Sequence, residues 1–249
     1  MRPVLCWACP VFPLSHEERD MTIVQSVDLT LSLDDVLSHQ GGARGRPVKP
    51  AVARLTRECL EIAQEHKLFK PAVVYERLPL AKIEGDRLVM EGGEVFEGLM
   101  LAIRFAGASE LVLAACTIGP KLDDTVQELH EADDDVRAFI IDGIGVSAMN
   151  VLGRETCSIV GNEVETEGIR ASGALSPRLH GIPLDNQIPL HKLVQSYHIG
   201  MTLTDGLMMI PKKPSSMILG VGNEMAQWSK EQVCEWCNLG RTCAYRATA

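Results

Sequence analysis

An irregular stretch at residues 170–188 interrupts an otherwise well-patterned chain of 249 residues. It contains Pro177, Pro183, Gly173 and Gly181, and Pro189 follows directly after it. Proline removes a backbone donor and fixes φ, while glycine permits turns, so neither a helix nor a strand is expected to run through the stretch. A loop of this length is typical of either a functional or a disordered segment. Its apolar side chains favour order, because they can anchor it to a core: Leu175, Leu179, Ile182, Leu184 and Ile188.

The residues that follow predict two strands, 200–204 and 216–221, with a connection at 207–214 that carries Lys212 and Lys213. An ordered loop beside a sheet, next to a basic turn, predicts a small-molecule site. The alternative is a long surface loop that is packed for stability alone. The pattern by itself does not separate these two interpretations.

The rest of the chain mixes helical and strand patterns without strict alternation. Helices are expected at 32–39, 50–67, 97–106, 121–131 and 133–159, strands at 21–28, 72–80 and 110–117, and a hairpin at 82–96. We therefore predict one α+β domain, with a mainly antiparallel twisted sheet and flanking helices. Strand 110–117 is apolar on both faces and belongs in the sheet interior. The domain is expected at 21–225, between a flexible extension or mis-start at 1–20 and a tail at 226–249.

Charge and hydropathy limit the function classes. The net charge of −9 makes nucleic acid an unexpected partner, because phosphate contacts need clustered lysine and arginine. The two most apolar regions, 99–116 and 138–151, are interrupted by charged residues and predict core elements rather than membrane spans. Residues 1–20 lack the layout of a secretory signal. These features predict a cytoplasmic protein that meets a small-molecule ligand or another protein, away from membranes.

The tail carries a cysteine cluster with the spacing C-x2-C-x5-C, formed by Cys234, Cys237 and Cys243. Two thiolates separated by two residues can bind one metal ion, and a third nearby nearly completes a coordination shell. We expect zinc with a fourth ligand, or a [4Fe–4S] cluster with one open iron. The alternatives are an isolated reducible Cys234–Cys237 pair and inert thiols.

Four phrases of the chain carry a resemblance to a known family. They are A-A-C-T-I-G-P-K-L-D from Ala114, I-D-G-I-G-V-S-A from Ile141, L-S-P-R-L-H-G-I-P-L-D-N-Q from Leu175, and I-G-M-T-L-T-D-G-L-M-M-I-P-K-K-P-S-S from Ile199. Together they resemble the reactivation domain of cobalamin-dependent methionine synthase and related stand-alone corrinoid-activation proteins, over roughly residues 50–222. The last two phrases are the specific ones, because their order and spacing are unusual.

The resemblance implies a C-shaped α+β domain that holds S-adenosylmethionine in a shallow groove and presents its methyl group to a corrinoid on a partner protein. Co(I) is a strong nucleophile that is easily lost as inactive Co(II). Reduction of Co(II) is uphill, so it must be coupled to a methyl transfer that traps the product. The contribution of the protein is then to position cofactor and donor and to exclude water.

The chain departs from the family pattern in the loop that grips the methyl donor. The family has an arginine, then three residues, then Gly-Tyr; here Ala174 stands at the arginine position and Arg178-Leu179 at the Gly-Tyr position. Arg170 lies too early to replace the arginine without a rearrangement. Asn150 stands near a position where the stand-alone relatives often have a glutamate.

The resemblance places the binding site in the loop that begins at Leu175 and in the basic connection at 207–214, which we call the lysine turn. The expected cofactor-binding residues are Ser176, Pro177, Arg178, Leu179, His180, Gly181, Thr204, Met209, Pro211, Lys212 and Lys213. Arg178 or the lysine pair can supply a new partner for the donor's carboxylate; the alternative is that all three are solvated charges. His180 can approach a corrinoid or its cobalt, or can simply form hydrogen bonds at the surface.

Three functions follow from these observations. The first is an accessory protein that reactivates cobalamin on a corrinoid protein or methyltransferase, with S-adenosylmethionine as methyl donor. The second is an iron–sulfur or zinc protein that reduces a corrinoid protein without S-adenosylmethionine. The third is a non-catalytic module that binds corrinoid proteins. The residues alone leave open whether the chain itself catalyses methyl transfer.

Overall fold

In the part of the chain that the structure describes, seven strands form one antiparallel sheet. The computed structural model describes residues 21–25, 27, 29–39, 48–179, 181–228 and 230–237. The strand order is β4-β3-β2-β5-β9-β6, with β1 on β2, and every pairing is antiparallel. The strands are β1 Thr22–Val24, β2 Ala72–Glu84, β3 Arg87–Met90, β4 Val95–Glu97, β5 Glu110–Thr117, β6 Arg170–Ala171 and β9 Pro214–Gly222. The predicted α+β class with an antiparallel sheet is confirmed.

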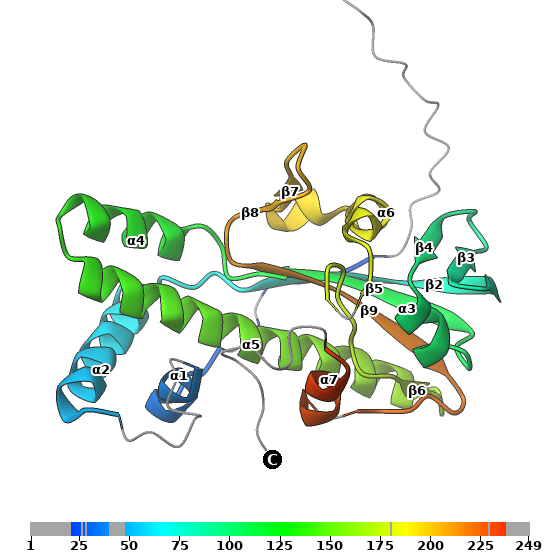
Figure 1. Ribbon diagram of the computed structural model, residues 1–249, viewed down its shortest axis with the longest axis horizontal. Coiled ribbons are helices and arrows are strands. Elements are labelled where there is room, and N and C mark those ends of the chain that lie inside the picture. Colours follow the sequence, from blue (N-terminus) through cyan, green and yellow to red (C-terminus); the bar gives the residue numbers. More distant parts are fainter. Residues whose placement is uncertain are drawn as a thin grey trace, which may run out of the picture.

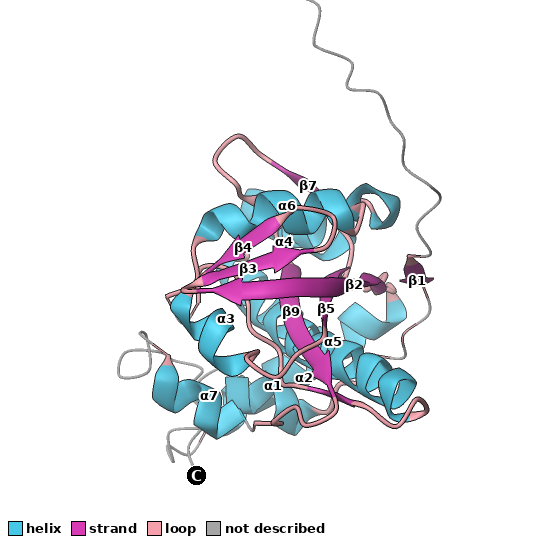
Figure 2. Cartoon of the chain, turned by 90° about the vertical axis from the view of Figure 1, so that its right-hand side faces the viewer, coloured by secondary structure: helices cyan, strands magenta, loops and turns pink. Residues whose placement is uncertain are grey.

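The helices lie on both faces of this sheet (Figures 1 and 2). They are α1 Leu33–His39, α2 Pro50–Glu65, α3 Leu99–Arg104, α4 Lys121–Glu131, α5 Asp135–Glu165, α6 Gln187–Leu193 and α7 Lys230–Trp236, with the 3-10 turns η2 Leu184–Asn186 and η3 Ser196–Ile199. Helix α5 runs along one face, where α2 and α4 contact it, and α6 lies on the other face (Figure 1). The two faces therefore belong to two different cores.

Alternation along the central strands divides the apolar side chains between these cores. Val112 and Ala114 of β5 belong to the cluster beneath α5, whereas Leu113 and Ala115 belong to the cluster on the face of α6. Successive side chains of a strand point to opposite faces, so a strand covered on both sides has to be apolar throughout. This explains why β5, between β2 and β9, is buried from Leu111 onward. The predicted interior position of strand 110–117 is confirmed.

The region from 200 to 222 differs from its prediction. Strand β7, Thr202–Leu203, pairs with β8, Met209–Ile210, and forms a separate two-stranded sheet. Only β9 joins the main sheet, so the two predicted strands are not neighbours. The prediction of a simple connection at 207–214 was wrong, because β8 lies within these residues. The turn between β7 and β8 is closed by a hydrogen bond from the Thr204 N–H to the Met208 carbonyl, 2.9 Å long.

The irregular stretch is only partly irregular. It begins with β6, and Leu175 forms an isolated bridge with Ile218 of β9. The expectation that no helix enters the stretch was wrong at its end, because α6 starts at Gln187 and includes Pro189. Proline is tolerated in the first turn of a helix, where its missing N–H would have no intrahelical acceptor.

Helix α5 is longer than predicted, reaching Glu165 rather than 159. Within the part of the chain that the structure describes, α5 alone is long and apolar enough to cross a membrane by length and composition, and half of its apolar window is buried in the fold. A core helix of a soluble protein has the same properties. The side chains of α5 that point toward β5 and β9 belong to the apolar cluster beneath α5.

Candidate functional site

The loop at 175–187, which we call the ligand loop, packs against β9 and turns back on itself. Leu175 is buried and exchanges two backbone hydrogen bonds with Ile218, 2.9 and 2.7 Å long. The Arg178 N–H donates to the Ile182 carbonyl at 2.9 Å, and the Leu179 N–H donates to the Ser176 carbonyl at 3.1 Å. These bonds close a compact turn.

Within that turn, Pro177 is buried while Arg178 is exposed, with a left-handed φ of 71°. Ser176 and Leu179 are half-buried, and Gly181 is exposed with a φ of 74°. His180 lies outside the described residues. Arg178 therefore remains available as a surface cation, whereas the neighbouring proline has a packing role.

The lysine turn has a different environment. The Lys213 ammonium lies 2.5 Å from Asp142 Oδ1 and 3.5 Å from Asp123 Oδ1, and its side chain is only 13% exposed. The Lys212 side chain is exposed, and its backbone N–H donates to Asp123 Oδ2 at 2.8 Å. Lys213 is thus already neutralised by α4 and α5, and Lys212 keeps a side chain that can meet a ligand.

The other predicted residues of this region close or support the β7–β8 hairpin. Thr204 Oγ1 accepts a hydrogen bond from the Met208 N–H at 3.1 Å. Met209 packs against the apolar cluster on the face of α6, and Pro211 is buried. In the described ranges, the ligand loop forms hydrogen bonds within itself, with β9 and, through Asn186, with the backbone of Glu97. The lysine turn bonds to Asp123 and Asp142, and the Lys213 carbonyl accepts from Thr117 of β5. Among the site residues that the structure describes, no such bond joins the two halves of the predicted site.

A cleft of about 670 Å³ lies between the second half of α5, β6 and the segment 225–228. We call it the α5–β6 cleft. It is lined by Cys157, Ser158, Gly161, Asn162, Glu165, Ile169, Arg170, Ala171, Ser172, Gly173, Met225, Ala226, Gln227 and Trp228. The α5 members share one face of the helix, since they recur at 157, 158, 161, 162 and 165.

Two glycines shape this cleft. A Cβ added to Gly161 would have no other atom within 4 Å, so the middle of the α5 wall is open. A Cβ added to Gly173 would lie 2.2 Å from Nε1 of Trp228, so the indole rests directly on the backbone there. The Trp228 Nε1 atom is buried and has no hydrogen-bond partner among the described residues. Because this atom is buried against Gly173, the Trp228 N–H is not accessible from the cleft.

Aromatic contacts hold the segment that closes the cleft. Trp228 stacks on Phe105 with ring centroids 6.4 Å apart and meets Trp236 edge-on at 5.8 Å. The Arg104 guanidinium lies 3.4 Å from the centre of the Trp236 ring. Stacked aromatic pairs and cation–π contacts each contribute about 1 kcal/mol. Helix α7 is therefore fixed against α3, and Trp228 is fixed at the cleft wall.

The cysteines divide into buried thiols and the tail cluster. Burial raises the pKa of Cys116 to about 12 and that of Cys157, which is half-buried, to about 11, so the reactive thiolate form of both is scarce at neutral pH. Cys234 and Cys237 are half-buried, on α7 and just after it, while Cys243 lies outside the described residues. Within the ranges that the structure describes, no group of three His, Cys, Asp or Glu side chains could hold a metal ion. The metal site at these cysteines stays a prediction.

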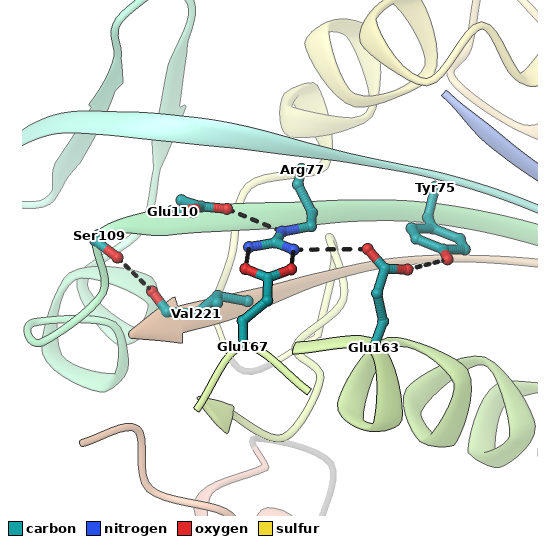
Figure 3. Close-up of polar contacts among 7 residues, drawn as sticks. All are labelled: Tyr75, Arg77, Ser109, Glu110, Glu163, Glu167 and Val221. Atoms are coloured by element: carbon teal, nitrogen blue, oxygen red, sulfur yellow. Dashed lines mark hydrogen bonds and ion pairs between the residues drawn. The ribbon is translucent and has the colours of Figure 1, made fainter. Parts of the chain in front are cut away.

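A polar clamp attaches the cleft wall to the sheet (Figure 3). The Tyr75 hydroxyl of β2 donates a short hydrogen bond to Glu163 of α5. Arg77 of β2 forms a two-pronged ion pair with Glu167 and donates from Nε to Glu110 at 2.9 Å. Burial and the bond to Glu163 raise the pKa of Tyr75 to about 12. The clamp fixes the end of α5 from which the cleft residues project.

Neither a protein-family model nor a curated protein sequence matches this chain. Its structure is similar to the solved structure described as the MetH reactivation domain bound to AdoHcy. The TM-score is 0.58 at 13% sequence identity, and the match covers 81% of this chain and 78% of that one. The chain has the fold of the MetH reactivation domain. At this identity the likeness is one of fold, and it bears out the architecture expected from the sequence resemblance.

Sequence reasoning missed the α5–β6 cleft. Its α5 residues lie at helical spacing, but the last three of them fall beyond 159, where the helix was predicted to end. Trp228 belonged to the predicted tail and was not considered. The signal that could have found the wall is the run of small and polar residues at 157, 158, 161 and 162 on one helical face.

Proposed function

We propose that this chain is a cytoplasmic accessory protein of corrinoid-dependent methyl transfer, which binds an S-adenosyl methyl donor and acts on a corrinoid carried by a separate protein. The observation that carries the proposal is the shared fold with a reactivation domain whose solved structure contains AdoHcy, over 81% of this chain. The four family-like phrases, found in the sequence independently of the fold, support it. Three of the four contain parts of strands β5, β8 and β9 or of the ligand loop beside them.

The chemistry of the proposal balances with a one-electron donor. That donor reduces Co(II) to Co(I), and Co(I) then attacks the methyl carbon of the sulfonium. The sulfur–carbon bond breaks, its electron pair stays on sulfur, and the products are methyl-Co(III) and AdoHcy. The second step traps the product of the unfavourable first step. The protein contributes binding, orientation and exclusion of water, none of which requires an acid or base.

Direct titration of the protein with AdoHcy and S-adenosylmethionine tests the proposal. We expect saturable calorimetric binding of both ligands at one site. With a corrinoid protein and a one-electron reductant, S-adenosylmethionine should convert the cob(II)alamin spectrum to that of methylcobalamin. Failure of both ligands to bind at millimolar concentration would refute the role of methyl-donor binding protein.

Arg178 is the candidate carboxylate partner on the ligand loop, because it is exposed and lies at the family's Gly-Tyr position. If it holds the donor, Arg178→Ala should weaken AdoHcy binding about tenfold or more, since a charged hydrogen bond is removed. Arg57→Ala on α2, an exposed arginine on the other face of the sheet, is the matched control and should bind normally. Equal affinity for the two variants would remove Arg178 from the site.

A second candidate function is a metal- or cluster-containing redox protein, favoured by the position of Cys234 and Cys237. The two thiols are half-buried and three residues apart at the end of α7, which aromatic contacts hold against the domain. This arrangement suits two ligands of one metal ion. Anaerobic purification followed by iron, sulfide and zinc analysis should find stoichiometric metal in the wild type and a loss in Cys234→Ser. Protein that is free of metal would end this alternative.

A further inference from the structure

We propose that the α5–β6 cleft, rather than the ligand loop, is where this chain binds an S-adenosyl amino acid. This inference rests on the proposed function and gives its ligand a different location in the molecule. It assigns the amino-acid end of the ligand to Arg170 and Glu165, and the nucleoside end to the wall that contains Trp228. The argument depends on the shape and charge of the cleft and on the polar side chains that line it.

The cleft has the size and the rigid walls of a small-molecule site. Its volume of about 670 Å³ lies within the range of about 300–1,000 Å³ that is common for ligand pockets. Its α5 wall is attached to β2 through Glu163 and Glu167, and its opposite wall is attached to α3 through Trp228. Because both walls are anchored, a ligand would not have to order them on binding.

Two opposite charges line the cleft without neutralising each other. Arg170 and Glu165 are both exposed, and neither forms an ion pair with any residue that the structure describes. An α-amino acid carries a carboxylate and an ammonium group on one carbon, and it therefore needs one cation and one anion close together. The guanidinium of Arg170 can receive the carboxylate in two-pronged geometry, and Glu165 can accept from the ammonium group.

The remaining polar groups suit a purine nucleoside. The ring nitrogens and ribose hydroxyls of a nucleoside need both hydrogen-bond donors and acceptors. The carboxamides of Asn162 and Gln227 also line the cleft, and each offers both a donor and an acceptor. The open position above Gly161 leaves room for a flat ring against the helix. A zwitterion joined to a nucleoside matches both ends of the cleft.

The ligand loop and the lysine turn offer a ligand fewer free hydrogen-bonding and charged groups than the cleft does. In the ligand loop, the backbone donors of Arg178 and Leu179 are already bonded within the turn, and Lys213 is neutralised by two carboxylates. The family's loop arginine is replaced by Ala174, which has no charge to offer a carboxylate. Arg170 precedes that position by four residues and faces a cleft instead of the loop. Arg170, at the neighbouring cleft, thus replaces the loop arginine of the family as the partner of the carboxylate.

Calorimetry with two ligands tests this assignment. AdoHcy carries both the nucleoside and the zwitterion, whereas methylthioadenosine lacks the amino-acid group. We expect Arg170→Gln and Glu165→Gln to weaken AdoHcy binding about tenfold or more and to leave methylthioadenosine binding unchanged. Arg154→Gln and Glu155→Gln are matched controls, because both residues are exposed on α5 and lie outside the cleft lining. They should bind both ligands like the wild type.

A third variant tests the cleft without changing charge. Gly161→Leu fills the open α5 wall and should abolish binding of both ligands, while circular dichroism and thermal unfolding confirm that the protein is folded. The proposal is overturned if AdoHcy binds Gly161→Leu, Arg170→Gln and Glu165→Gln as tightly as the wild type. If those three variants bind AdoHcy normally and Arg178→Ala does not, the ligand binds at the ligand loop, and the proposed function remains intact. A wild type that binds neither ligand overturns both proposals.

Discussion

Gly145 of α5 lies so close to Leu122 of α4 that a Cβ on the glycine would come within 2.8 Å of the leucine Cδ2. The same Cβ would also lie 3.3 Å from Cε of Lys213. Leu122 is fully buried, so it has little space to move away. Gly145 is therefore the point at which α4, α5 and the lysine turn converge, and only a residue without a side chain allows that approach.

Gly145→Ala should destabilise the protein. Overpacking a buried contact costs about 1–3 kcal/mol, and the higher helix propensity of alanine offsets about 1 kcal/mol of this. Gly161→Ala is the matched control on the same helix, where nothing lies within 4 Å of the new Cβ; it should stabilise the protein by up to about 1 kcal/mol. Urea unfolding of both variants measures the difference. Equal shifts in the two variants would show that α4 and α5 are not tightly packed at Gly145.

Lys213→Met should be costly where Lys212→Met is not. The first change leaves the Asp123 carboxylate, whose side chain is only 11% exposed, without its ammonium partner. Breaking a largely buried ion pair costs about 3 kcal/mol, reduced here because the Lys212 N–H still donates to Asp123 and Asp142 is half exposed. Lys212 is exposed, so its change should stay within about 0.5 kcal/mol. Thermal unfolding of the two variants compares them, and similar melting temperatures would contradict the buried-pair interpretation.

The clamp between Tyr75 and Glu163 makes stability sensitive to alkaline pH. The pKa of Tyr75 is raised from 10.0 to about 12, so between these values the unfolded chain loses a proton that the folded protein keeps. Stability should therefore fall as pH rises from about 10 to 12, by at most about 1.4 kcal/mol per unit from this group. Tyr75→Phe should lose this part of the slope. Denaturation at several alkaline pH values measures it, and an unchanged slope in the variant would exclude Tyr75 as its source.

Sequence patterns predicted the elements whose partners are local or whose hydrophobicity is extreme. The helix at α1 was expected from a capping serine, and Ser32 does accept the Asp35 N–H at 3.1 Å while its own N–H donates to the Asp35 carboxylate. Strand β5 was placed inside the sheet because both of its faces are apolar. In both examples the evidence lies within a few consecutive residues.

The features that escaped prediction depend on residues far apart in the chain. The Leu175–Ile218 bridge and the pairing of Asn186 with the backbone of Glu97 have no local signature, and they position the ligand loop and η2. The α5–β6 cleft forms where α5 meets Trp228, more than sixty residues away in sequence. Periodicity identifies which face of a helix is buried, but it does not identify which distant segment covers that face.

The buried His191 of α6 makes the protein sensitive to acid. Its Nδ1 lies 2.7 Å from Ser196 Oγ, while its Nε2 is buried and has no hydrogen-bond partner among the described residues. Burial lowers the pKa of His191 from 6.5 to about 4. Between these values the unfolded chain binds a proton that the folded protein does not, so stability falls as pH drops from about 6.5 to about 4 and levels off below that. The slope from this group is at most about 1.4 kcal/mol per pH unit.

His191→Gln removes the titrating group and should flatten this acid slope, although it also lowers stability at neutral pH by disturbing a buried site. Urea unfolding at a series of pH values from 4 to 7 gives the slope independently of the neutral-pH offset. If His191→Gln keeps the wild-type slope, His191 is protonated equally in the folded and unfolded chains, and α6 does not shield it from water as the structure requires.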